Sequence, residues 1–411
     1  MKKTLALSSA VLMLFGASVF AKESTLIDFT TLDADITIKA EDSDVEIPQN
    51  SRTIMDYGIA AGASFNKDQK DLMKSSLYLE EWEVILNGSA RNVNALAQSV
   101  VKPAPVRDSA DVPFAGSNVM GVRIVFPTAA VNSNAKIVPP FDIPAYEPLS
   151  TADENGNRQE PTDEEKASGR TLFEADDPES VDSPAYGVVK NVGTLKSIAV
   201  TTMGMNFPHG LYVLLTDTDN VTRRYFMGHL GFDGWRTLIW NNPDYISEVR
   251  TRELRAYPIY PRGLPFVKFA GFQITRDASQ VGGDFIGYFK DVKIIYDKAE
   301  LTTERDIADE DLWGIVTRKE AARQNLEMTR FGNKQIERYI EKSKMATEEK
   351  FTSSLGEDDE ESESSEEESS GGQSGEESEG EETSEEAATE EAPAEETAET
   401  EEAAAEPEAV Q

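Results

Sequence analysis

The sequence predicts a mainly β protein, a jelly roll or β-sandwich with flanking helices and a disordered acidic C-terminal tail. Three observations lead to this fold class. Short strand-like runs follow one another from 118 to 301 and are separated by Gly, Pro and Asn, as in antiparallel sandwiches. The segments 65–82 and 303–351 have helical patterns instead, and the last 61 residues are dominated by Glu, Ser and Ala.

Residues 1–21 form a predicted secretory signal peptide. Two lysines precede an apolar run from about Leu5 to Phe20, and Ala21 ends the cleavage site. No cysteine follows this site, so lipid attachment is not expected. No later apolar run approaches the ~18 residues that a membrane helix needs. We expect an exported chain that begins near Lys22 and does not insert into the membrane.

The composition narrows the possible chemistry. The chain has no cysteine, so disulfides and thiolate metal sites are excluded. The formal net charge is −36 for 411 residues, and residues 356–411 contribute −25 of it, which leaves −11 for the rest. An acidic surface argues against nucleic acid and anionic membranes as partners, because both require basic side chains.

The predicted domain organisation follows the changes in composition. A sandwich domain is expected over 22–301, a helical segment over 302–350 and a tail over 351–411. The tail has almost no large apolar side chains, so it cannot bury enough surface to fold. It is expected to be a solvated bristle or an electrostatic arm for a basic partner or divalent cations. A polar stretch at about 150–183 interrupts the sandwich and is expected to be an exposed, mobile insertion.

Strands are predicted where apolar residues alternate between turn residues. The hairpin at 209–232 has its turn at Asp217–Asn220. The last strand alternates imperfectly, as a strand with a bulge does. The predicted strands are 118–127, 195–208, the two arms of 209–232, 235–240, 265–279 and 283–301.

Both helical segments carry an apolar face. The first, 65–82, begins with Asn66 as its N-cap and places Leu72, Met73 and Leu77 on one side. The second, 303–351, begins with a loose capping box of Thr303 and Asp306. Its first apolar patch, Leu312, Trp313, Ile315 and Val316, is expected to pack on the sandwich. After a break at Gly332, the later part is expected to lead outward to the tail.

Catalytic and metal-binding signals are weak. Only His209 and His229 are present, and a metal site there would need carboxylate ligands as well; strand-end histidines are more often structural. The sequence DTDN at 217–220 offers oxygen ligands for calcium, but a hairpin turn with Asx hydrogen bonds is the preferred interpretation. There is no nucleophile elbow, P-loop or dinucleotide fingerprint. We therefore expect neither an enzyme nor a cofactor, although a carboxylate pair of the glycosidase kind remains an alternative.

The stretch GFDGWRTLIWNNPDYI at 231–246 holds the candidate binding residues. Aromatic rings that stack on sugars, with polar side chains for the hydroxyls, would make a carbohydrate site. Trp235 and Trp240 are five residues apart and face opposite sides of an ideal strand, which favours a core role for at least one. Core plus turn, a protein contact and sugar binding all remain open, with candidate residues Trp235, Arg236, Trp240, Asn241 and Asn242.

Several long segments carry a resemblance to a known family. Their sequences are HGLYVLLTDTDN, RRYFMGHLGFDGWRTLIWNNPDYI, FAGFQITRDAS and GGDFIGYFKDVKIIYD, and earlier segments at 26–36, 50–86 and 117–141 fit as well. Together they resemble the spirochaete periplasmic flagellar filament outer layer protein, the FlaA sheath class. The resemblance covers roughly 22–345 and leaves the acidic tail unexplained.

The resemblance implies a structural role. Proteins of this class coat a core of FlaB-type flagellin in the internal flagellum, so the expected partners are core flagellin and other sheath subunits, with glycans on the flagellin as a further candidate. The expected fold is a jelly roll similar to carbohydrate-binding modules. The family has no catalytic residues to carry over. The alternative function is a free periplasmic carbohydrate-binding module.

Overall fold

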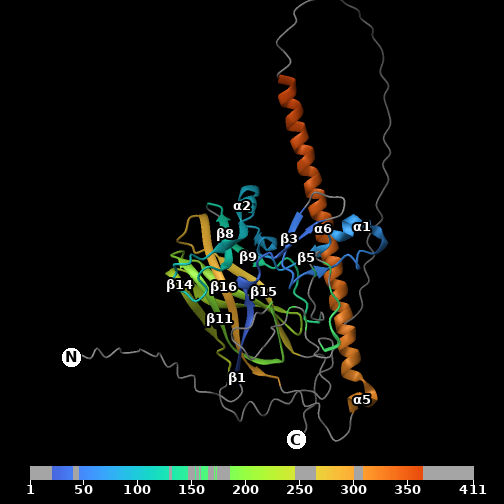
Figure 1. The fold of residues 1–411 in the computed structure, drawn as a ribbon. Helices are drawn as coiled ribbons and strands as arrows, with labels where there is room; N and C mark the ends of the chain where they lie inside the picture. Colours follow the sequence, from blue (N-terminus) through green and yellow to red (C-terminus); the bar gives the residue numbers. More distant parts are fainter. Residues whose placement is uncertain are drawn as a thin grey trace, which may run out of the picture. The chain divides into compact units, whose positions relative to one another are not determined.

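In the computed structural model the chain folds around two antiparallel sheets, each with six strands (Figure 1). The structure describes residues 21–39, 46–128, 132–146, 186–245, 265–299 and 309–363, together with residues 153, 157, 159–164, 171 and 173. A compact unit extends to Glu348, and the second unit begins at residue 349. The predicted mainly β sandwich with flanking helices is therefore confirmed.

The first sheet has β16 at its centre. β11 pairs with one edge of β16, and the other edge is shared by β8 and β1. β14 and β7 are the outermost strands. The strands are β14 (Asp233–Asn241), β11 (Val192–Met205), β16 (Gly283–Lys298), β8 (Asn118–Phe126), β7 (Val100–Pro105) and β1 (Ala21–Asp28).

The second sheet is organised around β15 in the same way. β12 lies along one edge, and β9 and β10 share the other. β13 and β6 are the outermost strands. The strands are β13 (Thr222–His229), β12 (Gly210–Asp217), β15 (Phe266–Thr275), β9 (Asn134–Val138), β6 (Glu83–Leu86) and β10 (Val188–Lys190).

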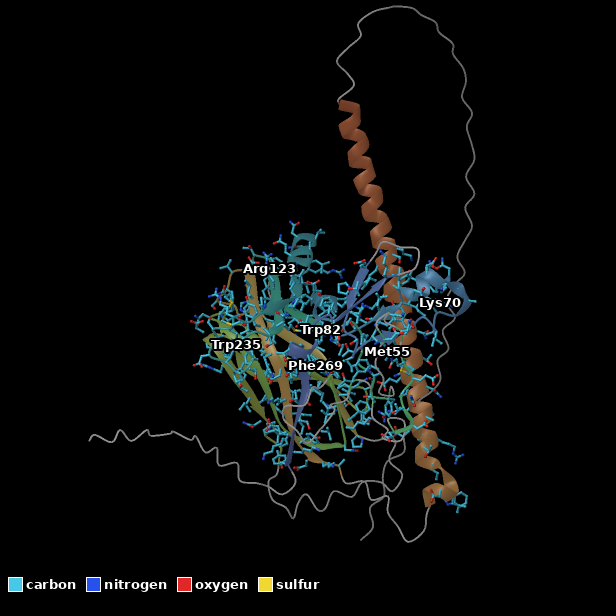
Figure 2. All side chains as sticks on the ribbon, in the orientation of Figure 1. Met55, Lys70, Trp82, Arg123, Trp235 and Phe269 are labelled. Atoms are coloured by element: carbon cyan, nitrogen blue, oxygen red, sulfur yellow. The ribbon has the colours of Figure 1, made fainter. Side chains whose placement is uncertain are left out.

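The core between the sheets is rich in aromatic side chains. Phe272 of the second sheet stacks on Phe289 of the first with ring centroids 4.5 Å apart. Phe29 and Trp82 lie against Phe269, at 6.1 and 6.0 Å, and Figure 2 shows Trp82 and Phe269 in the interior. Each buried aromatic removes roughly 150–250 Å² from water. These contacts hold the two sheets face to face.

The predicted strands are confirmed, including the bulge in the last one. Thr201 and Thr202 of β11 pair with Asp291 and Phe289, so the register skips Lys290. The extra residue lies beside two carboxylates: Lys290 Nζ is 2.8 Å from Asp28 Oδ2 and 2.9 Å from Asp291 Oδ2. Burial opposes the charge of Lys290, but the two carboxylates outweigh it and raise its pKa. The positive charge of the bulged Lys290 is thus balanced by the carboxylates of Asp28 and Asp291.

Short helices and strands connect the two sheets. The sequence analysis predicted one longer helix at 65–82 and left the other short elements unassigned. Helix α1 (Lys67–Asp71) has the predicted Asn66 cap, with a capping box formed by Gln69. The prediction that it continues to 82 is wrong, because the chain turns into a strand that pairs with Met55 and Asp56, and Met73 and Leu77 enter the core. The other short elements are β2 (Ile36–Lys39), β3 (Glu46–Gln49), β4 (Met55–Asp56), β5 (Lys74–Ser75), α2 (Val93–Gln98) and the 3-10 turns η1 (Phe29–Thr31), η2 (Gly62–Ser64) and η3 (Leu79–Glu81).

The C-terminal helical segment reverses the predicted packing. Helices α5 (Asp309–Trp313) and α6 (Ile315–Glu363) are present, but the expected anchor residues Leu312 and Trp313 are exposed. The middle of α6 packs instead, on both sides of Gly332. Phe331 is buried against Tyr57 and Phe141, and Tyr339 lies 6.0 Å from Phe65. Among the described residues, the ring contacts of α6 begin at Arg323, which lies over Phe266, and continue through Phe331 and Tyr339.

The expected break at Gly332 is also wrong, because α6 continues through it. A Cβ at Gly332 would lie 2.5 Å from Ala60 Cβ. The glycine therefore lets the helix approach the neighbouring segment closely, at a cost of about 1 kcal/mol in helix propensity. Sequence alone shows the propensity and not the close approach.

Three further predictions concern segments that lie mostly outside the described residues. Of the predicted signal peptide at 1–21, residues 1–20 are not described, and Ala21 is the first residue of β1. In the polar insertion at 150–183, the buried Thr171 and Phe173 contradict uniform exposure, and Phe173 lies 5.5 Å from Phe141. α6 extends to Glu363, thirteen residues beyond the predicted end of the helical segment at 350, and the remaining residues of the tail are not described.

Candidate functional site

The candidate residues of the 231–246 stretch lie on and just after β14. Of the described strands only β11 pairs with β14, so β14 forms an edge of the first sheet. Trp240 pairs with the fully buried Ile198, whereas Trp235 pairs with the half-buried Met203. The two tryptophans therefore point to opposite faces of the sheet, as their odd spacing predicted.

Trp240 lies on the inner face, where it packs against the core. Its ring centroid is 4.8 Å from that of Tyr225 on β13, the edge strand of the other sheet. Arg236 points to the same face, with its guanidinium 4.4 Å from the Phe232 ring centroid. Trp240 and Tyr225 thus close this side of the sandwich.

Trp235 begins a row of half-buried side chains across the outer face, which we call the outer row: Trp235, Met203, Tyr288 and Phe114. Met203 pairs with Trp235 on one side and with Tyr288 on the other. The Phe114 ring lies edge-on to Trp235, with centroids 4.8 Å apart. Figure 2 shows Trp235 at the outside of the sandwich. The outer row offers apolar contact area that no described element covers.

Asn242 has a structural role in the turn after β14. Its side-chain amide donates to Leu195 O at 2.8 Å, and its Oδ1 accepts from the Asp244 backbone N–H at 3.0 Å. The turn continues to Tyr245, whose hydroxyl donates to Asp297 Oδ1 at 3.0 Å. Asn241 is exposed. Of the candidate residues, Asn242 therefore has the role in a turn that the sequence analysis considered for this segment.

The five candidate residues do not form one constellation. Trp235 and Asn241 share the outer face but are six residues apart, or roughly 20 Å along a strand. Arg236 and Trp240 point to the other face. A sugar platform needs its stacking rings and polar groups on one face, so these residues do not assemble one. The outer row is the part of the stretch that is available for contact.

Both histidines take part in local packing. His209 is buried between Phe126, Phe207 and Phe285, stacked on Phe285 at 5.3 Å, and burial lowers its pKa to about 4. Its Nδ1 accepts a long hydrogen bond from the Asp277 backbone N–H at 3.5 Å. The exposed His229 donates from Nδ1 to Pro208 O at 3.3 Å. Among the described residues, no group of three or more acidic or histidine side chains could hold a metal ion.

The DTDN segment forms the predicted hairpin turn. Asp217 Oδ1 accepts from the backbone N–H groups of Asp219 and Val221, at 3.1 and 3.2 Å. Asn220 has a φ of 58°, a conformation that asparagine tolerates better than most residues. Arg223 also pairs with the Asp217 carboxylate. The Asp217 carboxylate, one of the oxygen groups considered for calcium, is thus engaged in the turn.

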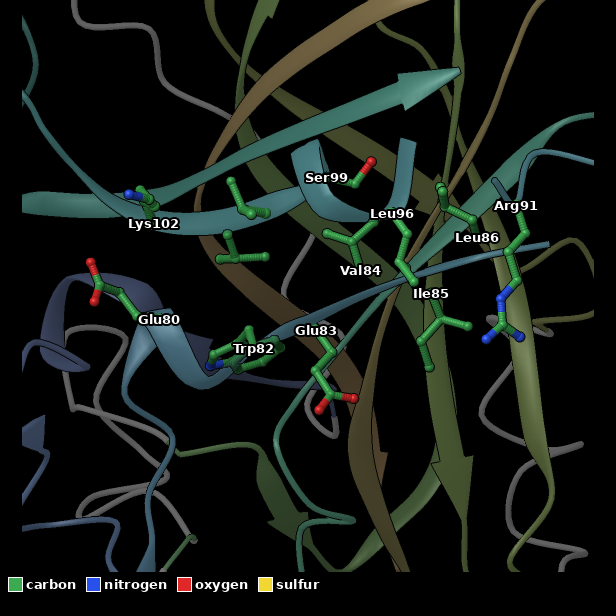
Figure 3. A pocket seen from close by; sticks show the side chains of 12 residues that line it. Glu80, Trp82, Glu83, Val84, Ile85, Leu86, Arg91, Leu96, Ser99 and Lys102 are labelled. Atoms are coloured by element: carbon green, nitrogen blue, oxygen red, sulfur yellow. The ribbon is translucent and has the colours of Figure 1, made fainter. Parts of the chain in front are cut away.

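A second surface was missed by the sequence analysis, which we call the edge groove. It is a cavity of about 620 Å³ between the edge strands β6 and β7, partly covered by α2 (Figure 3). Its wall is apolar and consists of Val84, Leu86, Leu96, Val100 and Val101. The alternation in WEVIL at 82–86 and the run VVKPAP at 100–105 were the available signals.

Charged residues line the rim of the edge groove. The two acids have partners within the chain: Glu83 pairs with Arg338, and Glu80 accepts a hydrogen bond from Tyr78, whose pKa is raised by burial and by this carboxylate. The two bases, Arg91 and Lys102, are exposed, and no ion pair joins them to another described residue. The groove is therefore apolar inside with two free positive charges at its rim.

Comparison with known proteins identifies the family. The family described as "Flagellar filament outer layer protein Flaa" matches residues 46–305. A protein of Treponema pallidum (strain Nichols), named flagellar filament outer layer protein, is 55% identical over 356 residues, which are 87% of this chain and 98% of that protein. This chain belongs to the flagellar filament outer layer protein family.

Two further members agree with this assignment. The flagellar filament outer layer protein of Spirochaeta aurantia is 39% identical over 351 residues, or 85% of this chain and 95% of that protein. The protein of the same name from Borreliella burgdorferi is 31% identical over 262 residues, or 64% and 67%. Membership makes the chain a structural protein of the flagellar filament. None of the described helices is long and apolar enough to cross a membrane.

Similar solved structures are β-sandwich carbohydrate-binding modules. One structure, on promiscuous carbohydrate-binding modules of the β-sandwich superfamily, covers 52% of this chain and 56% of its own, with 9% identity and a TM-score of 0.24. TmCBM61 in complex with β-1,4-galactotriose covers 53% and 88%, with 10% identity and a TM-score of 0.22. Similarity this low transfers no binding site to this chain.

Proposed function

We propose that this chain is a sheath subunit that coats the FlaB-type flagellin core of periplasmic flagella and contributes to filament stiffness, shape and motility. The observation that carries the proposal is the match to 98% of the length of a named outer layer protein. The proposal includes export by the signal peptide, with cleavage after Ala21. Mass spectrometry of the mature N-terminus tests that step, because a chain that still carries residues 1–21 contradicts it.

The fold suits a subunit that works by being stacked. Two sheets joined by aromatic packing form a rigid block. Identical contacts repeated from copy to copy generate an open assembly around a helical core. Material added at large radius resists bending of a rod. Because the chain has no cysteine, its fold depends on no disulfide that an oxidising or reducing compartment could make or break.

Within this proposal, the outer row is the surface that contacts the flagellin core. Its aromatic and Met side chains are residue types enriched at protein interfaces. Ile239, on the same face of β14, pairs with Ala199 and is 55% exposed, which extends the apolar surface along the edge strand. Covering this face would remove apolar area from water without rearranging the sandwich.

Cosedimentation of the purified chain with sheath-free flagellin filaments tests the proposal. Ile239→Asp places a charge in the contact and should lower the amount bound at least about tenfold, a change of roughly 1.4 kcal/mol. Val281→Asp is the matched control, because Val281 is also exposed, at 69%, and lies outside the outer row. Absence of the wild-type chain from purified periplasmic flagella would sink the proposal.

The free carbohydrate-binding module is the alternative, and the half-buried Trp235 and the exposed Asn241 on the outer face motivate its test. A glycan array with no binder above background would count against the free module, and the same cosedimentation with deglycosylated filaments separates a protein contact from a hybrid that grips glycans on the flagellin. Binding that is unchanged after deglycosylation supports a protein contact. Binding that is lost after deglycosylation, together with a positive glycan array, supports recognition of glycans on the flagellin.

A further inference from the structure

The corner between α5 and α6 holds two exposed apolar side chains in a fixed position. Leu312 is 67% exposed and Trp313 is 58% exposed. Gly314 makes the corner with a φ of 53°. Arg318, one turn into α6, donates to Trp313 O at 2.6 Å and to Gly314 O at 3.1 Å. An ordered corner that exposes a tryptophan has the features of an interface anchor.

The edge groove has matching properties. Its volume of about 620 Å³ is in the range of pockets that enclose a compact ligand. The indole of a tryptophan together with a neighbouring leucine side chain is an apolar group of this size. Leu96 and Val100 in its wall are 40% and 37% exposed. Figure 3 shows Val84 and Leu96 close together, with Glu83 and Arg91 toward the rim. The groove thus lacks an apolar occupant among the described residues.

The corner cannot reach the groove of its own chain. α6 is anchored beside the groove through Arg338, which pairs with Glu83, and Lys342, which is 3.6 Å from Glu81. Trp313 precedes Arg338 by 25 residues, so a continuous helix places the corner roughly 37 Å away. Figure 1 shows α5 and α2 far apart. Any contact between corner and groove must therefore join two copies.

We propose that the corner of one copy, with Leu312 and Trp313, inserts into the edge groove of the next copy and so links sheath subunits head to tail. This inference rests on the proposed function and names the surface through which neighbouring subunits bind. The two surfaces are different and lie apart on the same chain, so the contact is heterologous. Such a contact propagates into an open row.

Charge complementarity supports this occupant. α5 has the sequence Asp-Glu-Asp-Leu-Trp, and Asp311 is exposed. The rim of the groove presents Arg91 and Lys102, whereas Glu83 is neutralised by Arg338 and, among the described residues, Glu80 is the one acid at the rim that keeps an unpaired charge. An acidic, apolar corner therefore meets a basic, apolar groove. This pairing orients the corner as it docks and disfavours the reversed arrangement.

The absence of cysteine makes disulfide trapping a direct test. Full-length Thr317→Cys protein, which keeps the Leu312 and Trp313 anchor, is mixed in solution with full-length Leu96→Cys protein under mild oxidation, and the mixed dimer is measured. We expect it to form about tenfold faster than with Val281→Cys, because docking raises the local concentration of the two thiols. All three positions are exposed, so folding should be preserved. Equal rates with Leu96→Cys and Val281→Cys overturn the proposal.

Two further measurements separate this contact from other occupants. Lys102→Glu and Asp311→Lys should each slow trapping, and the exchange of both charges should restore it; failure of the exchange contradicts the assigned polarity. A photo-cross-linking side chain in place of Leu96, in intact flagella, should join two copies of this chain. A product with flagellin instead overturns the proposal while leaving the sheath function intact. Absence of the chain from flagella overturns the sheath function, whereas the trapping in solution still decides the contact.

Discussion

Trp235 and Trp240 lie on the same strand but have different surroundings, because their spacing places them on opposite faces. Trp240 packs on the core beside Tyr225, and Trp235 meets Phe114 at the outer surface. The first contact belongs to folding. The second remains available for binding, and this division can be measured with two single substitutions.

Trp240→Ala should lower the free energy of unfolding by about 2–3 kcal/mol, since it removes a large side chain packed on the core. Trp235→Ala should cost only about 1 kcal/mol, the scale of one aromatic pair. Urea denaturation at unchanged m-value measures both. Equal losses, or a larger loss at Trp235, would contradict the assignment of faces.

His209 should make stability depend on pH. Burial lowers its pKa from 6.5 to about 4, so between these values the unfolded chain binds a proton that the folded chain does not. This contribution is fully present above pH 6.5 and is lost as the pH falls toward 4, by at most about 1.4 kcal/mol per pH unit.

The test compares the wild type with His209→Gln, which cannot titrate. Melting temperatures measured from pH 7 to pH 4 should fall less steeply for the variant, because it lacks the imidazole that takes up a proton on unfolding. The carboxylates are common to both proteins, so their effect cancels in the difference. Parallel curves would show that His209 does not titrate as described.

At the scale of elements, the sequence predicted the long strands better than the short ones. Val122, Ile124 and Phe126 alternate clearly and are buried as expected. β6 and β7 were not predicted, because β6 is only four residues long and β7 contains two prolines, and both features weaken the strand pattern. The edge groove between them was therefore missed. The sequence pattern within one strand shows the alternation of its side chains, but it does not show which strands lie next to each other in the fold.

For the helices, too, the sequence predicted local features and missed those that depend on tertiary contacts. The Asn66 cap depends on neighbouring residues and was predicted correctly. The end of α1 depends on pairing between β4 and β5, which is a tertiary contact. Which part of α6 packs depends on where Tyr57 and Phe141 lie. The outer row likewise needed the register of β11 and β16, which the separate strands do not contain.

Docking of α6 should depend on the size of the residue at 332. Gly332→Ala puts a methyl group 2.5 Å from Ala60 Cβ. The helix must then shift, with an expected loss of about 1–3 kcal/mol despite the better helix propensity of alanine. Thermal unfolding measures the loss, and limited proteolysis of α6 reports undocking.

Ala60→Gly provides the matched control for this contact. Combined with Gly332→Ala, it transfers the missing methyl group to the partner and should restore most of the lost stability. A double variant whose losses simply add would show that the two residues do not meet. A stabilised Gly332→Ala single variant would show that helix propensity outweighs packing there.

At the scale of the whole molecule, charge and packing are separated along the chain. The compact unit ends at Glu348, and most of the negative charge follows it: residues 356–411 carry 25 acidic and no basic residues. A subunit with this division can stack through its sandwich while a dense charge stays attached to its C-terminal end. Like charges on neighbouring filaments repel each other over roughly 10 Å at 0.1 M salt.

Deletion after Leu355 should therefore separate folding from colloidal behaviour. The melting temperature should stay within about 2 °C of the wild type, because the described packing contacts lie in the compact unit. Flagella coated with the shortened chain should associate laterally at low salt, where the intact tail repels, and light scattering measures this association. A tail of equal length with Gln and Asn in place of Glu and Asp is the control. If flagella with the neutral tail stay as dispersed as flagella with the acidic one, bulk and not charge keeps them apart.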